Sequence, residues 1–118
     1  MRNIVQQWAE AKGELAIELT RLWAAIDDSF KAIRSECGQW VSRDAIAQEI
    51  ARSHGLSLVA SASSLGLVAG DCHWWPRYGG HLHGPLSQAK EIAARLATIS
   101  DLEIRQVAEL VLARKSAA

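Results

Sequence analysis

The sequence has no surplus of charge of either sign, because 13 basic residues balance 13 acidic ones. A chain without a basic surplus has no overall field that draws it to nucleic acid or to an anionic membrane surface. A long apolar run is missing too: the longest weakly polar stretch, residues 56–70, is shorter than a membrane-spanning helix and contains serines. These absences predict no membrane partner, and they count against nucleic acid as a partner.

Cysteine is scarce, and Cys37 and Cys72 are too few for a disulfide scaffold. The first residues, MRNIVQQWAEAK, lack the apolar stretch of a secretory signal. We therefore expect a cytoplasmic protein with two reduced thiols. The sequence predicts no cofactor.

The chain has 118 residues, 49% of them hydrophobic, and is expected to fold as a single helical domain over residues 1–118. Residues 3–36 predict one long helix, which Gly13 could bend and Gly38 is expected to end. Its apolar residues recur at spacings of three, four or seven and form one stripe. This stripe holds Ile4, Trp8, Leu15, Leu19, Leu22, Ile26, Phe30 and Ile33, and it is broadened by Val5, Ile17 and Trp23.

The rest of the chain predicts shorter elements. A short second helix should follow Ser42, whose hydroxyl can cap it, and should end at Gly55. Residues 85–115 predict two helices with a very short connection, that is, a helical hairpin. The segment between them, residues 56–84, is expected to be irregular, although its first half is compatible with a small-residue strand or a buried helix. The predicted fold class is all-α or nearly so.

The length of the first helix predicts self-association. A helix over residues 3–36 spans about 50 Å, whereas a compact domain of this size has a radius of gyration of about 13–14 Å. An unbroken helix would extend beyond its own domain and leave Ile4, Val5 and Trp8 in water. The sequence therefore predicts a homodimer formed largely through this helix.

The middle of the chain is unusually poor in charge, because Asp71 and Arg77 are the only charged residues between Ser53 and Ala89. Its aromatic run HWWPRYGG is rich in the residue types that dominate protein–protein interfaces, where large rigid side chains lose water at a low entropic cost. The sequence predicts a partner-binding surface made by Trp74, Trp75, Arg77, Tyr78, His81 and His83. The alternative is that one or both tryptophans cover the domain's own core.

Two other interpretations are weighed against this surface. Cys72, His81 and His83 could bind one metal ion, but they match no established ligand spacing, so no metal is assigned. Residues 43–66, in which Gly55 follows a helical segment, resemble the start of a helix-turn-helix motif. That resemblance implies a DNA-binding regulator, although residues 57–70 hold none of the Arg, Lys, Asn or Gln side chains that read bases.

An acidic row at Glu10, Glu14 and Glu18 is a second candidate surface on the long helix. Like charges spaced by four repel mildly on an isolated helix, and binding to a basic target would offset this repulsion. No catalytic motif is present, and no catalytic residue is assigned. We expect a small non-catalytic regulatory, adaptor or inhibitor protein that acts by binding another protein or protein complex.

Overall fold

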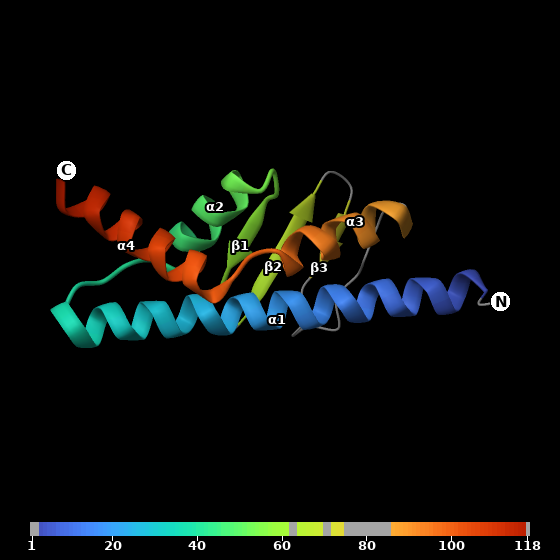
Figure 1. Cartoon of the computed structure of the whole chain (residues 1–118), viewed down its shortest axis with the longest axis horizontal. Helices are drawn as coiled ribbons and strands as arrows, with labels where there is room; N and C mark the ends of the chain where they lie inside the picture. Colours follow the sequence, from blue (N-terminus) through green and yellow to red (C-terminus); the bar gives the residue numbers. More distant parts are fainter. Residues whose placement is uncertain (1–2, 62–63, 70–71, 75–85, 118) are drawn as a thin grey trace.

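A computed structural model of the chain describes residues 3–61, 64–69, 72–74 and 86–117. The described residues form four helices and three short strands (Figure 1). Their order is α1 (Ile4–Cys37), α2 (Arg43–Ser53), β1 (Leu58–Ala60), β2 (Leu65–Ala69), β3 (Cys72–Trp74), α3 (Leu86–Ala97) and α4 (Asp101–Ala117). The nearly all-α fold class, with a long first helix, a short second one and two C-terminal helices, is confirmed.

Both ends of helix α1 are set by local features, a capping hydrogen-bond pair at its start and a left-handed glycine at its end. Asn3 Oδ1 accepts a hydrogen bond from the backbone N–H of Gln6 at 2.9 Å, and the Gln6 side chain accepts one from the backbone N–H of Asn3 at 3.1 Å. This reciprocal pair is a capping box. Gly38, with φ 69°, adopts the left-handed conformation that ends the helix, as predicted. Gly13 does not break it.

One face of α1 forms the centre of the hydrophobic core. The predicted stripe is buried over most of its length, at Leu15, Leu19, Leu22, Ile26, Phe30 and Ile33. The prediction was wrong for Ile17, which is 67% exposed, whereas Val5 is 72% exposed, as the length of the helix predicts. At about 100° per residue, Ile17 lies on the side of the helix away from the stripe.

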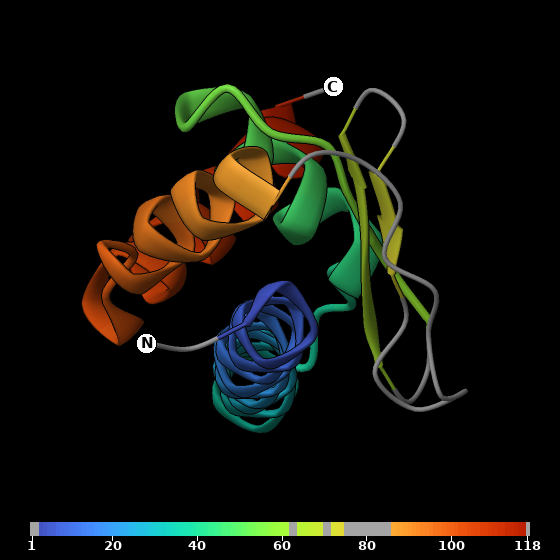
Figure 2. The same cartoon turned by 90° about the vertical axis from the view of Figure 1, so that its right-hand side faces the viewer.

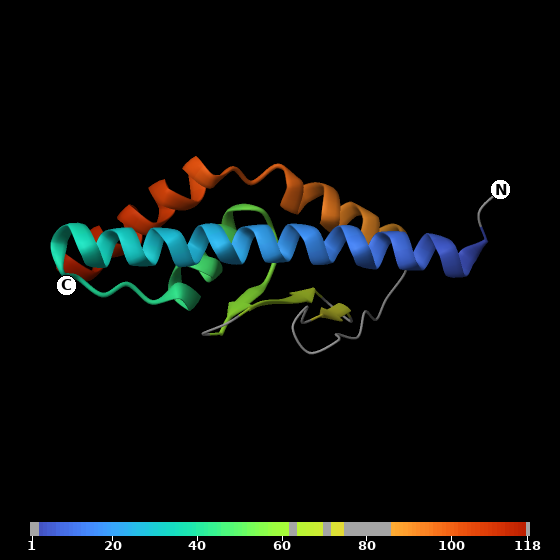
Figure 3. The same cartoon turned by 90° about the horizontal axis from the view of Figure 1, so that it is seen from below.

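Helix α1 lies at one edge of the molecule, and the other elements surround its remaining sides (Figure 2). Helices α3 and α4 pack against one side of it, and α2 and the sheet lie on the other. Residues 98–100 join α3 to α4, and Ser100 Oγ accepts a hydrogen bond from the backbone N–H of Glu103 at 3.1 Å. The predicted pair of C-terminal helices with a short connection is therefore present. The two helices open into a wide V along α1 (Figure 3).

The strands form one antiparallel sheet in the order β1-β2-β3. Leu58 pairs with Leu67, and Leu67 pairs with Trp74. This part of residues 56–84 is more regular than predicted. The reason is packing: Leu58, Leu65 and Leu67 are almost fully buried, and Leu65 and Leu67, two apart, share one face of the sheet.

The same strands correct the helix-turn-helix interpretation of residues 43–66. The first helix and the turn are present, because α2 ends at Ser53 and Gly55 has a φ of 68°. In the described part of the segment, however, the second helix is replaced by β1 and the start of β2. The described part of residues 43–66 thus has no recognition helix, and the helix-turn-helix interpretation was wrong.

The molecule is elongated, with extents of 53 × 22 × 21 Å and a radius of gyration of 15.1 Å. Helix α1 runs along the whole of the long axis, and its N-terminal turns project beyond the start of α3 (Figures 1 and 3). The predicted extension of the helix past its own domain is thus confirmed.

Candidate interaction surface

The projecting end of α1 carries apolar side chains that the described part of the chain does not cover. Ile4 is 59% exposed and Val5 is 72% exposed, whereas Trp8 is partly buried against the core. Ile4 is four residues before Trp8 and seven before Ala11, so it lies on the same face as the buried stripe. The core-facing stripe therefore continues past the body of the protein. We call Ile4, Val5 and Trp8 the N-terminal patch.

Most of the predicted aromatic partner-binding surface lies outside the residues that the structure describes. Trp75, Arg77, Tyr78, His81 and His83 lie outside the described residues. The backbone of Trp74 belongs to β3, but its side chain also lies outside the described part. The role of this set stays a prediction.

The predicted metal ligands also lie largely outside the described residues. Cys72 is placed in β3 by its backbone alone, and His81 and His83 lie outside the described residues. Within the described ranges, no three His, Cys, Asp or Glu side chains lie close enough together to hold a metal ion. His54, at the end of α2, instead forms a 2.6 Å hydrogen bond through Nε2 with Glu103 Oε2 on α4, so it joins two helices.

The three glutamates of the acidic row on α1 differ in their exposure and contacts. Glu10 and Glu14 are exposed, whereas Glu18 forms an ion pair with Arg21 at 3.0 Å. Arg21 also donates a hydrogen bond to the carbonyl oxygen of Leu96 at 3.0 Å and contacts Asp101 at 3.3 Å. One end of the row is thus tied to the helices that pack on α1, and the other end faces solvent.

A buried ion pair that the sequence did not reveal fixes α2 to α1. Asp27 is only 6% exposed, and its carboxylate contacts Arg43 Nε at 2.8 Å and Lys31 Nζ at 2.9 Å. Burial by itself raises the pKa of Asp27, but the hydrogen bonds from Lys31 and Arg43 outweigh burial and hold the pKa below its ordinary value. Asp27 is therefore an ionised group that positions the start of α2.

An aromatic pair, one ring buried and one half-exposed, lies beside this ion pair. The Trp40 ring is 5.4 Å from the ring of Phe30, and the guanidinium of Arg34 stacks 3.7 Å from the Trp40 ring centroid. Arg43 in turn lies over the ring of Phe30 at 4.1 Å. Trp40 is still 52% exposed. Trp40 is thus a half-covered ring in the connection between α1 and α2.

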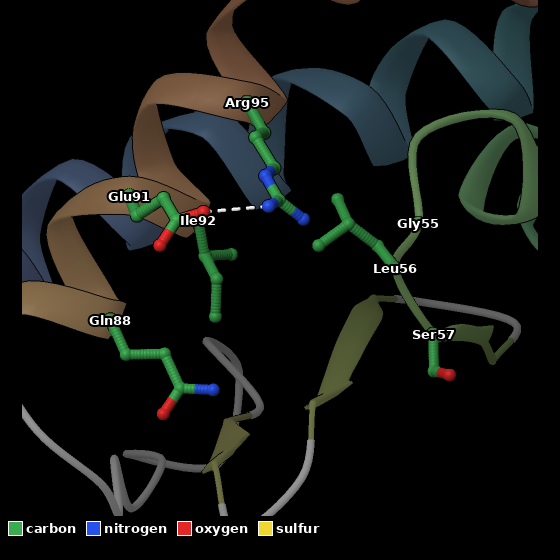
Figure 4. Close-up of a pocket in the computed structure, with 7 residues that line it drawn as sticks. All are labelled: Gly55, Leu56, Ser57, Gln88, Glu91, Ile92 and Arg95. Carbon is green, nitrogen blue, oxygen red and sulfur yellow. Dashed lines mark hydrogen bonds and ion pairs between the residues drawn. The ribbon is translucent and has the colours of Figure 1, made fainter.

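A pocket of about 340 Å³ lies between the residues that follow α2 and the face of α3 turned toward them (Figure 4). It is lined by Gly55, Leu56, Ser57, Gln88, Glu91, Ile92 and Arg95. Arg95 Nη2 donates to Glu91 Oε1 at 2.6 Å, the pair that the sequence spacing favours. Most of the charge in the lining is therefore already neutralised, and the pocket can offer an amide, a hydroxyl and an apolar floor to a small polar group.

Comparison with known proteins adds no relative: no protein-family model, curated protein or solved structure matches this chain. Among the helices that the structure describes, none combines the length and apolarity needed to cross a bilayer.

Proposed function

We propose that this is a small non-catalytic regulatory, adaptor or inhibitor protein that binds another protein or protein complex and does so as a homodimer built through α1. The observation that carries the proposal is the N-terminal patch, an apolar surface on a helix end that projects beyond the body. A further part of the proposal is a cytoplasmic location, where Cys37, which is exposed, stays reduced.

Exposure alone does not support a partner, because single exposed apolar side chains are common on protein surfaces. The angular position of Ile4 on the helix is what supports a partner. It continues the stripe formed by buried residues such as Leu15, so the same face of one helix is covered along the body and bare at the end. Burying one such side chain stabilises an association by about 1.5–3 kcal/mol.

The dimer is tested by the molar mass of the protein in solution, measured by light scattering at tens of micromolar. The wild-type protein should have twice the 12.9 kDa mass of one chain. The double change Ile4→Ser and Val5→Ser should give single chains, whereas Leu102→Ser, at a residue that is 67% exposed on α4, should remain a dimer. A wild-type mass of one chain at this concentration would contradict the proposal.

The aromatic set is proposed as the surface that contacts the target. Changing Trp75 and Tyr78 together to alanine should abolish capture of a specific larger protein from the native host, as read by mass spectrometry. Helical circular dichroism should be unchanged, because the set is assigned to a surface and not to the core. Unfolding of this double variant would show that the rings belong to the core.

A further inference from the structure

A shallow groove of about 230 Å³ lies between α1 and α3 and is separate from the N-terminal patch. Its lining consists of Glu14, Ile17 and Glu18 from α1 and of Lys90, Ala93, Ala94 and Ala97 from α3. Sites for drug-sized molecules are usually larger, at about 300–1,000 Å³. This volume instead suits one large apolar side chain inserted from outside.

Ile17 makes one wall of the groove apolar. It is 67% exposed and lies away from the core-facing stripe. Ala94 and Ala97, across the groove, are also exposed, and their short side chains let the backbone of another element approach closely. Figure 2 shows that α3 and the sheet leave the outer side of α1 uncovered, so a third element has room beside both helices. The shape fits a helix that lies in a groove between two others.

The charges on the two walls differ in sign. Glu14 stands on the α1 wall and Lys90 on the α3 wall, and both are exposed. Within the described part of the chain, neither forms an ion pair with another residue, in contrast to Glu18, which is paired with Arg21. A bound helix with basic residues along one flank and acidic residues along the other would complement both walls.

We infer that the α1–α3 groove binds an amphipathic helix of a partner protein, with a leucine or similar side chain next to Ile17, basic residues facing Glu14 and an acidic residue facing Lys90. This inference rests on the proposed role as a binding protein and names the class of partner. It does not depend on the dimer, because the groove and the N-terminal patch share no residue.

The probe for this site is a synthetic amphipathic helical peptide with an alanine seam, one central leucine, lysines on one flank and glutamates on the other. Its binding to the wild-type protein is measured by fluorescence anisotropy at low salt, where the charges contribute most. Saturable binding is expected. The same peptide with its leucine changed to aspartate should bind at least about tenfold more weakly, because the apolar anchor is lost.

Protein variants locate the site. Ile17→Asp should weaken binding of the leucine peptide at least about tenfold, and Leu102→Asp is the matched control, since Leu102 is equally exposed, at 67%, on α4. Glu14→Lys should weaken binding by placing two positive charges across the groove. Adding Lys90→Glu should restore binding, because the peptide can then lie in the opposite direction with its flanks exchanged. Circular dichroism should match the wild type for all four variants.

Four results would overturn the inference. If Ile17→Asp binds the peptide as tightly as the wild type does, the peptide binds elsewhere on the protein. The same conclusion follows if Leu102→Asp weakens binding as much as Ile17→Asp does. Absence of saturable binding to the wild type would show that the groove does not take such a helix. A wild-type dimer that becomes a single chain on Ile17→Asp would show that the groove faces a second copy. The mass measurement on the Ile4 and Val5 variant uses no peptide, so its failure is distinguishable from each of these.

Discussion

The Asp27 ion pair allows a graded prediction for the stability of the protein. Asp27 is buried, whereas its two partners differ in exposure: the side chain of Arg43 is 26% exposed and that of Lys31 is 67% exposed. The buried bond to Arg43 should therefore contribute much more to the free energy of unfolding than the solvent-screened bond to Lys31.

The magnitudes follow from the exposure of each partner. Lys31→Met should cost under about 1 kcal/mol, because exposed ion pairs contribute little. Asp27→Asn removes the charge from two hydrogen bonds and should cost about 2 kcal/mol. Arg43→Met should cost about 3 kcal/mol or more, because it leaves a buried carboxylate with one exposed partner and removes the cation–π contact with Phe30.

The effect of pH provides an independent check on the same group. The folded-state pKa of Asp27 lies below its ordinary value of 3.8, so the ionised carboxylate stabilises the fold fully above that value. This stabilisation is lost as the pH falls through the lower folded-state pKa. The difference in unfolding free energy between wild type and Asp27→Asn should therefore be largest at neutral pH and shrink in acid.

Urea unfolding followed by far-ultraviolet circular dichroism measures all three variants at neutral and acidic pH. The expected order of destabilisation is Arg43→Met, then Asp27→Asn, then Lys31→Met. Equal losses for Asp27→Asn and Lys31→Met would refute the reasoning from burial. A constant difference between wild type and Asp27→Asn at every pH would refute the assignment of an ionised, hydrogen-bonded carboxylate.

Other stability predictions use the same unfolding assay. Gly13→Ala should raise the free energy of unfolding by about 0.5–1 kcal/mol, because a Cβ at this helical position meets no atom within 4 Å; a loss would contradict an unstrained helix there. Gly38→Ala should lower it by about 1–2 kcal/mol, since φ is 69°. Ser42→Ala removes the cap of α2 and should cost about 1 kcal/mol. Ile46→Ala, at a fully buried position, should cost about 2–5 kcal/mol, whereas Leu110→Ala, 45% exposed, should cost under about 0.5 kcal/mol.

The helices could be predicted from the sequence because their signals are local. The period of the apolar residues identifies α1, and Gly38 and Ser42 mark the break between α1 and α2 through backbone and capping chemistry that acts within a few residues. The phase of a single residue was harder to assign: Ile17 was included in the stripe by residue type, although its angular position puts it on the outer face.

The sheet and the Asp27 pair could not be predicted because they depend on contacts between distant parts of the chain. The strands β1 and β2 consist largely of small and apolar residues that fit a strand or a buried helix equally well, and only their pairing decides between the two. Asp27 lies sixteen residues from Arg43, and nothing in its local sequence separates it from an ordinary exposed acid. The exposure of Ile4 and Val5, in contrast, was predicted from helix length. The prediction was wrong for Trp8, which was also expected in water but is partly buried against the core.

The unbroken course of α1 fixes the distance between its two ends. One helix connects Ile4, at one end of the 53 Å long axis, with the connection that holds Trp40 near the other. A residue inserted into this helix would lengthen it by about 1.5 Å and turn one end by about 100° relative to the other, so it would also shift the buried stripe out of phase with the core.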